Sequence, residues 1–64
     1  MASKEFLNKC LDLHRALINN RVDVSIKFRS DNNECTISAN GKSRTYVDGK
    51  DEVDVNTELK AFLR

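Results

Sequence analysis

Three residues carry the side chains that most often perform chemistry: the single histidine, His14, and the two cysteines, Cys10 and Cys35. An imidazole can serve as an acid–base group, a metal ligand or a pH-responsive contact. His14 follows Cys10 by one helical turn, but no nucleophile or carboxylate stands at a spacing that indicates acid–base catalysis. We interpret His14 as a core or core-edge residue bonded to a backbone carbonyl, with a role in a site as the alternative. Since no catalytic constellation is present, we expect the protein not to be an enzyme.

Metal binding is weakly supported by the pattern. Structural zinc sites use four ligands, usually with paired ligands at short spacing such as Cys-x2-4-Cys, whereas Cys10 and Cys35 are isolated from each other in the sequence. Both fall on predicted core faces, where a free thiol behaves as a small hydrophobic group. Segments 31–34 and 54–58 offer oxygen ligands but lack the glycine of a calcium loop. We therefore expect no metal and no cofactor.

The strongest candidate for a binding site is a run of carboxylates. Asp48, Asp51, Glu52 and Asp54 fall within seven positions of a chain whose formal net charge is +1. One interpretation is a solvated loop that also places negative charge at the N-terminus of the last helix. The functional hypothesis is that these four residues bind a basic surface of a protein partner, whose identity the sequence does not give.

A second charged group supports an alternative function. Lys27, Arg29, Lys42 and Arg44 lie in the predicted strands and could contact nucleic acid through phosphate. The net charge of +1 gives no global attraction to nucleic acid or to anionic lipid. Readers of single-stranded nucleic acid present aromatic rings on the open sheet face, and this predicted face has none. Its residues are Ser25, Lys27, Arg29, Thr36, Ser38, Ser43 and Thr45. Nucleic-acid binding is therefore the disfavoured alternative.

Residues 22–39 show the period-2 alternation of a β-hairpin. Apolar residues from Val22 to Phe28 alternate with polar ones, the turn cluster 30–33 follows, and the alternation resumes through Ala39. With a four-residue loop the predicted pairs are Val24 with Ala39, Ile26 with Ile37, Phe28 with Cys35, and Arg29 with Glu34. A one-residue shift would place every apolar side chain opposite a polar one, so the register is well specified.

A third strand is predicted from Lys42 to about Val47, because Asn40-Gly41 is the typical sequence of a two-residue type I′ turn. That turn pairs Ala39 with Lys42, Ile37 with Arg44 and Cys35 with Tyr46, and places Tyr46 on the core face. A bulge after Gly41 would instead turn Val47 inward. We favour the simple turn, because Tyr46 is the larger apolar group and basic residues suit an edge strand.

Helices are predicted at both ends of the chain. Ser3 can cap a first helix that runs to Asn19 or Asn20, where asparagine would adopt the left-handed stop. Its predicted apolar stripe is Phe6, Leu7, Cys10, Leu11, Leu17 and Ile18, with Leu13 at the border. Asp54 is the predicted N-cap of a short last helix, whose apolar positions are Val55, Leu59, Phe62 and Leu63.

These elements predict one small α+β domain over residues 1–64: a helix, a three-stranded antiparallel meander and a short helix (α-β-β-β-α), with both helices on one sheet face. The chain shows no signal peptide and no apolar stretch of the roughly 20 residues that span a membrane. Its two cysteines suit a reducing cytoplasm. We expect a small protein-binding regulator, inhibitor or accessory subunit, a class that phages and mobile elements often encode. A homodimer is a further hypothesis, formed through Leu13 or through the edge strand 42–47.

Overall fold

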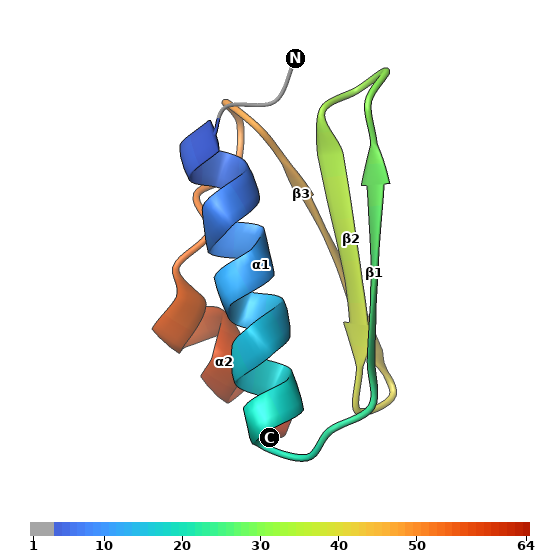
Figure 1. Ribbon diagram of the computed structural model, residues 1–64, viewed down its shortest axis with the longest axis vertical. Helices are drawn as coiled ribbons and strands as arrows, with labels where there is room; N and C mark the ends of the chain where they lie inside the picture. The colour runs from blue at the N-terminus through green and yellow to red at the C-terminus, as the bar shows by residue number, and fades with distance from the viewer. Residues whose placement is uncertain (1–3) are drawn as a thin grey trace.

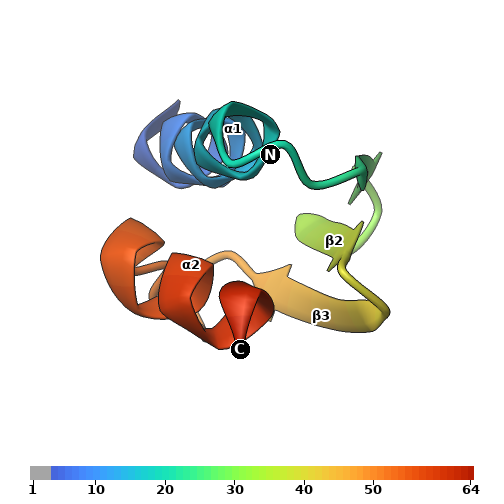
Figure 2. The ribbon, with the colours of Figure 1, turned by 90° about the horizontal axis from the view of Figure 1, so that it is seen from below.

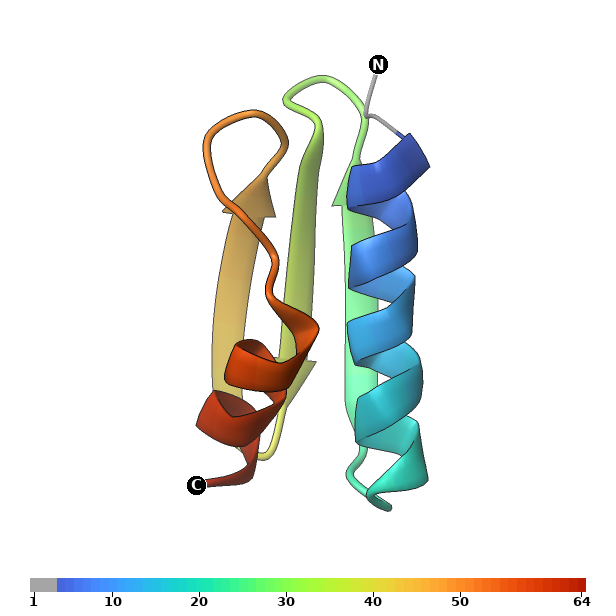
Figure 3. The same cartoon turned by 90° about the vertical axis from the view of Figure 1, so that its left-hand side faces the viewer.

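The computed structural model describes residues 4–64 and shows the predicted α-β-β-β-α order (Figure 1). The elements are α1 (Lys4–Asn19), β1 (Val24–Arg29), β2 (Glu34–Ala39), β3 (Lys42–Val47) and α2 (Val55–Leu63). The strands form one sheet in the order β1-β2-β3. Both helices cover the same face of this sheet (Figure 2), with α1 running along β1 and α2 lying in front of part of β3 (Figure 3). The predicted cap at Ser3 lies outside the described residues.

The predicted strand registers are confirmed. Ile26 pairs with Ile37 and Phe28 with Cys35 in the first hairpin. Cys35 pairs with Tyr46 in the second, and both turn residues have positive φ: Asn40 at 52° and Gly41 at 74°. That is the type I′ geometry, and it excludes a bulge at this point. Tyr46 is accordingly buried, as predicted.

The core face of α1 differs from the prediction. Phe6, Cys10, Leu13 and Leu17 are buried and form the centre of the core, whereas Leu11 and Ile18 are exposed. Leu13, predicted at the border, is therefore central. The physical reason is that α1 contacts α2 as well as the sheet, which turns the helix toward the stripe at i, i+4, i+7 and i+11.

Two further apolar positions predicted to be buried are exposed. Phe28 faces the core side of the sheet, but β1 is an edge strand and no described segment covers its outer side. Leu63 follows the buried Phe62 and is turned about 100° away from it around α2. Val53, which precedes α2, is buried instead and completes the core near the start of that helix.

Helix α1 ends at Asn19, as predicted, but the left-handed stop falls on a different residue from the one predicted. Arg21, rather than Asn19 or Asn20, has the left-handed conformation, with φ at 60°. The Arg21 amide donates to the Ile18 carbonyl at 2.9 Å and the Val22 amide donates to the Leu17 carbonyl at 3.2 Å. These two bonds form a Schellman motif, which requires the residue after the helix to be left-handed.

Both ends of α2 are satisfied by side chains. The Asp54 carboxylate accepts a hydrogen bond from the Thr57 amide at 3.2 Å, which confirms the predicted N-cap. At the other end, Lys42 Nζ donates to the carbonyls of Ala61 and Arg64, and Asn40 Nδ2 donates to the Phe62 carbonyl at 2.8 Å. The β2–β3 turn therefore anchors the end of α2 to the sheet.

Candidate functional site

The four predicted partner-binding carboxylates lie in the connection between β3 and α2, but they are not equivalent. Asp51 Oδ2 accepts a hydrogen bond from the Val47 amide at 2.9 Å and so stabilises the turn after β3. Asp54 caps α2. Asp48 is half-buried, with its amide donating to the Asn33 carbonyl at 3.0 Å, and Glu52 is exposed. Local structure thus uses the carboxylates of Asp51 and Asp54, and Asp48 is half-buried, so the exposed carboxylate of Glu52 is the best candidate of the four for contact with a partner.

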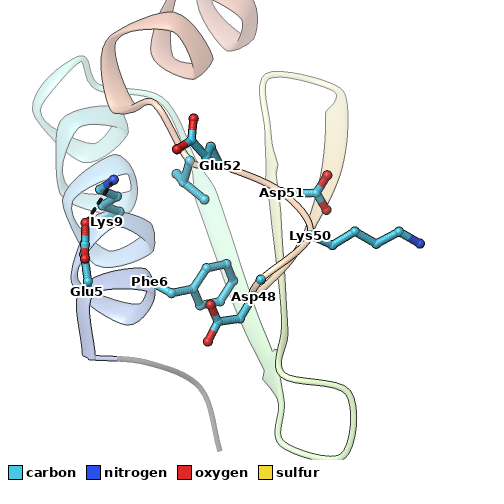
Figure 4. Close-up of a pocket in the computed structure, with 9 residues that line it drawn as sticks. Glu5, Phe6, Lys9, Asp48, Lys50, Asp51 and Glu52 are labelled. Atoms are coloured by element: carbon cyan, nitrogen blue, oxygen red, sulfur yellow. Dashed lines mark ion pairs between the residues drawn. The ribbon is translucent and has the colours of Figure 1, made fainter.

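Asp48, Asp51 and Glu52 line a shallow pocket of about 250 Å³ between this connection and the first turns of α1 (Figure 4). We call it the acidic pocket, and its lining residues are Glu5, Phe6, Lys9, Asp48, Gly49, Lys50, Asp51, Glu52 and Val53. Glu5 belongs to α1 and adds a fourth carboxylate that the sequence did not link to the others. Only the packing of α1 beside the β3–α2 connection brings it there.

The two lysines of the acidic pocket do not neutralise it. Lys9 forms an ion pair with Glu5 at 3.5 Å, with side chains 43% and 80% exposed. Exposed pairs of this kind are screened by water and exchange partners easily. Lys50 extends away from the pocket (Figure 4). The local field around the opening is therefore negative.

The floor of the acidic pocket is apolar. Phe6 and Val53, both nearly fully buried, line it beneath the carboxylates. An apolar floor under an acidic rim suits a ligand with a hydrocarbon stem and a cationic head. Lysine and arginine side chains have this composition.

The four basic residues of the alternative hypothesis do not form one patch. Lys27 pairs with Thr36 and lies on the open sheet face with Arg29, whereas Lys42 and Arg44 lie on the face that carries the helices. Lys42 binds the end of α2, and Arg29 Nη2 lies 3.3 Å from Asp31 Oδ2. The sheet therefore holds the pair Lys27 and Arg29 on the opposite face from the pair Lys42 and Arg44, although the sequence hypothesis grouped all four. The rest of the open face pairs hydroxyls across strands, as between Thr36 and Thr45 at 3.0 Å.

Arg44 takes part in a polar cluster that the sequence analysis missed. Glu58 Oε1 accepts a hydrogen bond from the Tyr46 hydroxyl at 2.6 Å and lies 2.8 Å from Arg44 Nε. The Glu58 side chain is only 12% exposed, so its charge depends on these partners. Burial, and then the bond to Glu58, raises the pKa of the Tyr46 phenol. Part of this cluster was already implied by the predicted strand register, which places Arg44 and Tyr46 together on the sheet face that carries the helices.

Cys10 and Cys35 meet in the core, where α1 packs on β2. Both are free thiols and fully buried. The hydrogen bond that the Cys10 thiol donates to Cys35, and then burial, raise the pKa of the Cys10 thiol, so it stays protonated at neutral pH. His14 is half-buried on α1. Within residues 4–64, no group of three histidine, cysteine, aspartate or glutamate residues is arranged to hold a metal ion.

Comparisons with protein-family models, curated proteins and solved structures give no significant match to this chain. Neither helix described between residues 4 and 64 has the length and apolar character to cross a membrane.

Proposed function

We propose that the protein is a non-enzymatic protein-binding module whose acidic pocket receives a lysine or arginine side chain of a protein partner. The observation that supports this proposal is the combination of an acidic rim (Glu5, Asp48, Glu52) with an apolar floor (Phe6, Val53) in one cavity. A regulator, inhibitor or accessory subunit is the role that fits such a small binding chain.

The apolar floor and the acidic rim of the pocket contribute to binding in different ways. The hydrocarbon stem of the incoming residue packs against Phe6 and Val53, and because these two side chains are already nearly buried, the apolar surface removed from water is mainly that of the stem. Its cationic head meets the carboxylates of Glu5, Asp48 and Glu52. Because Glu5 and Glu52 are exposed to solvent, their carboxylates mainly accelerate encounter and select a cation, and they add less to the affinity itself. Binding is therefore expected to weaken as salt concentration rises.

The variant that tests the proposal is Glu52→Lys. Glu52 is exposed, and its replacement leaves the turn at Asp51 and the helix cap at Asp54 in place. Asp12→Lys is the matched control, because the substitution makes the same change in net charge. Asp12 is also exposed, and it lies on α1 outside the pocket lining.

The experiment is affinity capture from a lysate of the source cell, run with and without nuclease treatment, with wild type and both variants as bait. We expect a protein partner that wild type and Asp12→Lys retain and that Glu52→Lys loses. Equal retention by all three baits contradicts the acidic pocket as the site. A signal that disappears with nuclease supports the nucleic-acid alternative instead.

A further inference from the structure

One flank of the molecule exposes apolar side chains from two elements. Leu11 and Ile18 of α1 are 45% and 51% exposed, and Phe28 of β1 is 41% exposed. Leu11 and Ile18 lie about 110–130° around α1 from the middle of the buried stripe, on the side opposite Lys9. Lys9 borders the connection to α2, so Leu11 and Ile18 are on the side away from α2. In Figure 2, α1 and β1 together form the end of the two layers opposite α2 and β3. We call this surface the α1–β1 flank.

The free edge of β1 lies in the same flank. A two-residue turn closes Ala39 and Lys42 as a hydrogen-bonded pair, and such pairs alternate along an antiparallel ladder. The backbone groups of Cys35, Ile37 and Ala39 therefore point toward β3, and those of the alternate β2 residues point toward β1. It follows that the backbone groups of Val24, Ile26 and Phe28 point outward from β1.

The two edge strands differ in whether their outward backbone groups have hydrogen-bond partners. On β3 the same alternation makes the backbone groups of Val47 point outward from the sheet. The Val47 amide donates to the Asp51 carboxylate, and the Val47 carbonyl accepts from the amides of Lys50 and Asp51. That edge also carries basic residues, which discourage strand pairing. Within the described part of the chain, no segment pairs with the outer edge of β1.

The sequence of β1 is complementary to itself in an antiparallel arrangement. With Ile26 opposite Ile26 on a two-fold axis, Val24 faces Phe28, Ser25 faces Lys27 and Asp23 faces Arg29. Each apolar residue meets an apolar residue, and the charged ends form two opposite-charge pairs. A shift of two residues in one direction places Lys27 opposite Lys27, and in the other direction Arg21 opposite Arg29. Repulsion disfavours both alternatives.

We propose that two copies of this chain associate through β1 in that register to form a continuous six-stranded sheet. The two α1 helices then lie side by side across the two-fold axis, with Leu11 and Ile18 covering the seam. An exposed apolar patch next to an unpaired strand edge is typical of such an interface. The dimer edge in this proposal is β1. The sequence pattern indicates a dimer through Leu13 or through the edge strand 42–47, and Leu13 is buried.

Charge reversal tests the register directly. Asp23→Lys places a second cation opposite Arg29, and Arg29→Glu places a second anion opposite Asp23, so each variant turns two attractive pairs into repulsive ones. We expect each to raise the dimer dissociation constant by on the order of tenfold. The double variant D23K/R29E restores opposite charges and should return the constant to near the wild-type value. Both residues are exposed, and circular dichroism verifies that each variant stays folded.

Sedimentation equilibrium of the whole chain up to high micromolar concentration provides the measurement. The expected result is a mass of two chains for wild type and for D23K/R29E, with weaker association for each single variant and for Ile18→Glu. A mass of one chain for wild type overturns the proposal. So does a larger oligomer, or a double variant that associates no better than the two single variants.

Discussion

The cluster of Tyr46, Glu58 and Arg44 gives the sharpest test of the packing between α2 and the sheet. Tyr46→Phe removes only the hydroxyl that donates to Glu58 at 2.6 Å and leaves the ring in place. A hydrogen bond to a charged group contributes about 1.5–3 kcal/mol. Because Arg44 Nε still lies 2.8 Å from Glu58, we expect the lower part of that range, about 1.5–2 kcal/mol. In a domain of this size that loss lowers Tm by roughly 6–16 °C.

The pH dependence of the same cluster has a definite sign. Folding raises the pKa of Tyr46 above its ordinary value, so the folded state holds the phenolic proton more tightly than the unfolded state. This contribution to stability is complete below the unfolded pKa of about 10 and is lost as the pH rises through the folded pKa. Tyr46→Phe lacks this alkaline loss, and other titrating groups affect both proteins alike.

The assays are thermal melts at neutral and alkaline pH and tyrosinate absorbance of the folded protein. Tyr46 is the only tyrosine in the chain, so the absorbance reports this residue alone. We expect the midpoint of the folded protein to lie above that of the chain in denaturant. Equal midpoints, or a Tyr46→Phe variant that melts with the wild type, would refute the hydrogen bond to a buried Glu58.

Three other substitutions test separate parts of the fold. Ile37→Ala opens a cavity at a fully buried site and should cost about 2–5 kcal/mol in urea unfolding, clearly more than Ile26→Ala at the partly covered edge strand. Arg21→Gly should raise the free energy of unfolding by roughly 1 kcal/mol in the same assay, because glycine adopts positive φ without strain. Asp54→Ala removes the cap of α2 and should lower Tm by an amount equivalent to about 0.5–2 kcal/mol, while Asp54→Asn should retain most of the stability.

The sheet was predictable because its information is local. Period-2 alternation and the Asn40-Gly41 turn determine both registers, and the structure confirms them. The orientation of α1 was not predictable in the same way. Leu11 and Ile18 form a stripe as apolar as that of Leu13 and Leu17, and only the position of α2 decides which stripe is buried.

The candidate site shows the same division between local and tertiary information. The carboxylates of the β3–α2 connection are contiguous in sequence, so their concentration could be recognised. Glu5 and Phe6 join them only through tertiary packing, and no local pattern indicates this. The placement of Lys27 and Arg44 on opposite sheet faces could have been predicted, because the predicted pairing of Arg44 with Ile37 already assigns Arg44 to the face that carries the helices.

The most direct test of the acidic pocket is a nuclear magnetic resonance titration with two small probes that differ only in charge. N-acetylarginine amide carries the proposed cationic head, and its citrulline counterpart is a nearly isosteric neutral control. We predict that the arginine probe shifts the amide resonances of Glu5, Phe6 and Val53, that citrulline shifts them far less, and that Glu52→Lys weakens the response. Shifts that are equal for both probes, or that fall on the open sheet face at Thr36 and Thr45, would contradict the account.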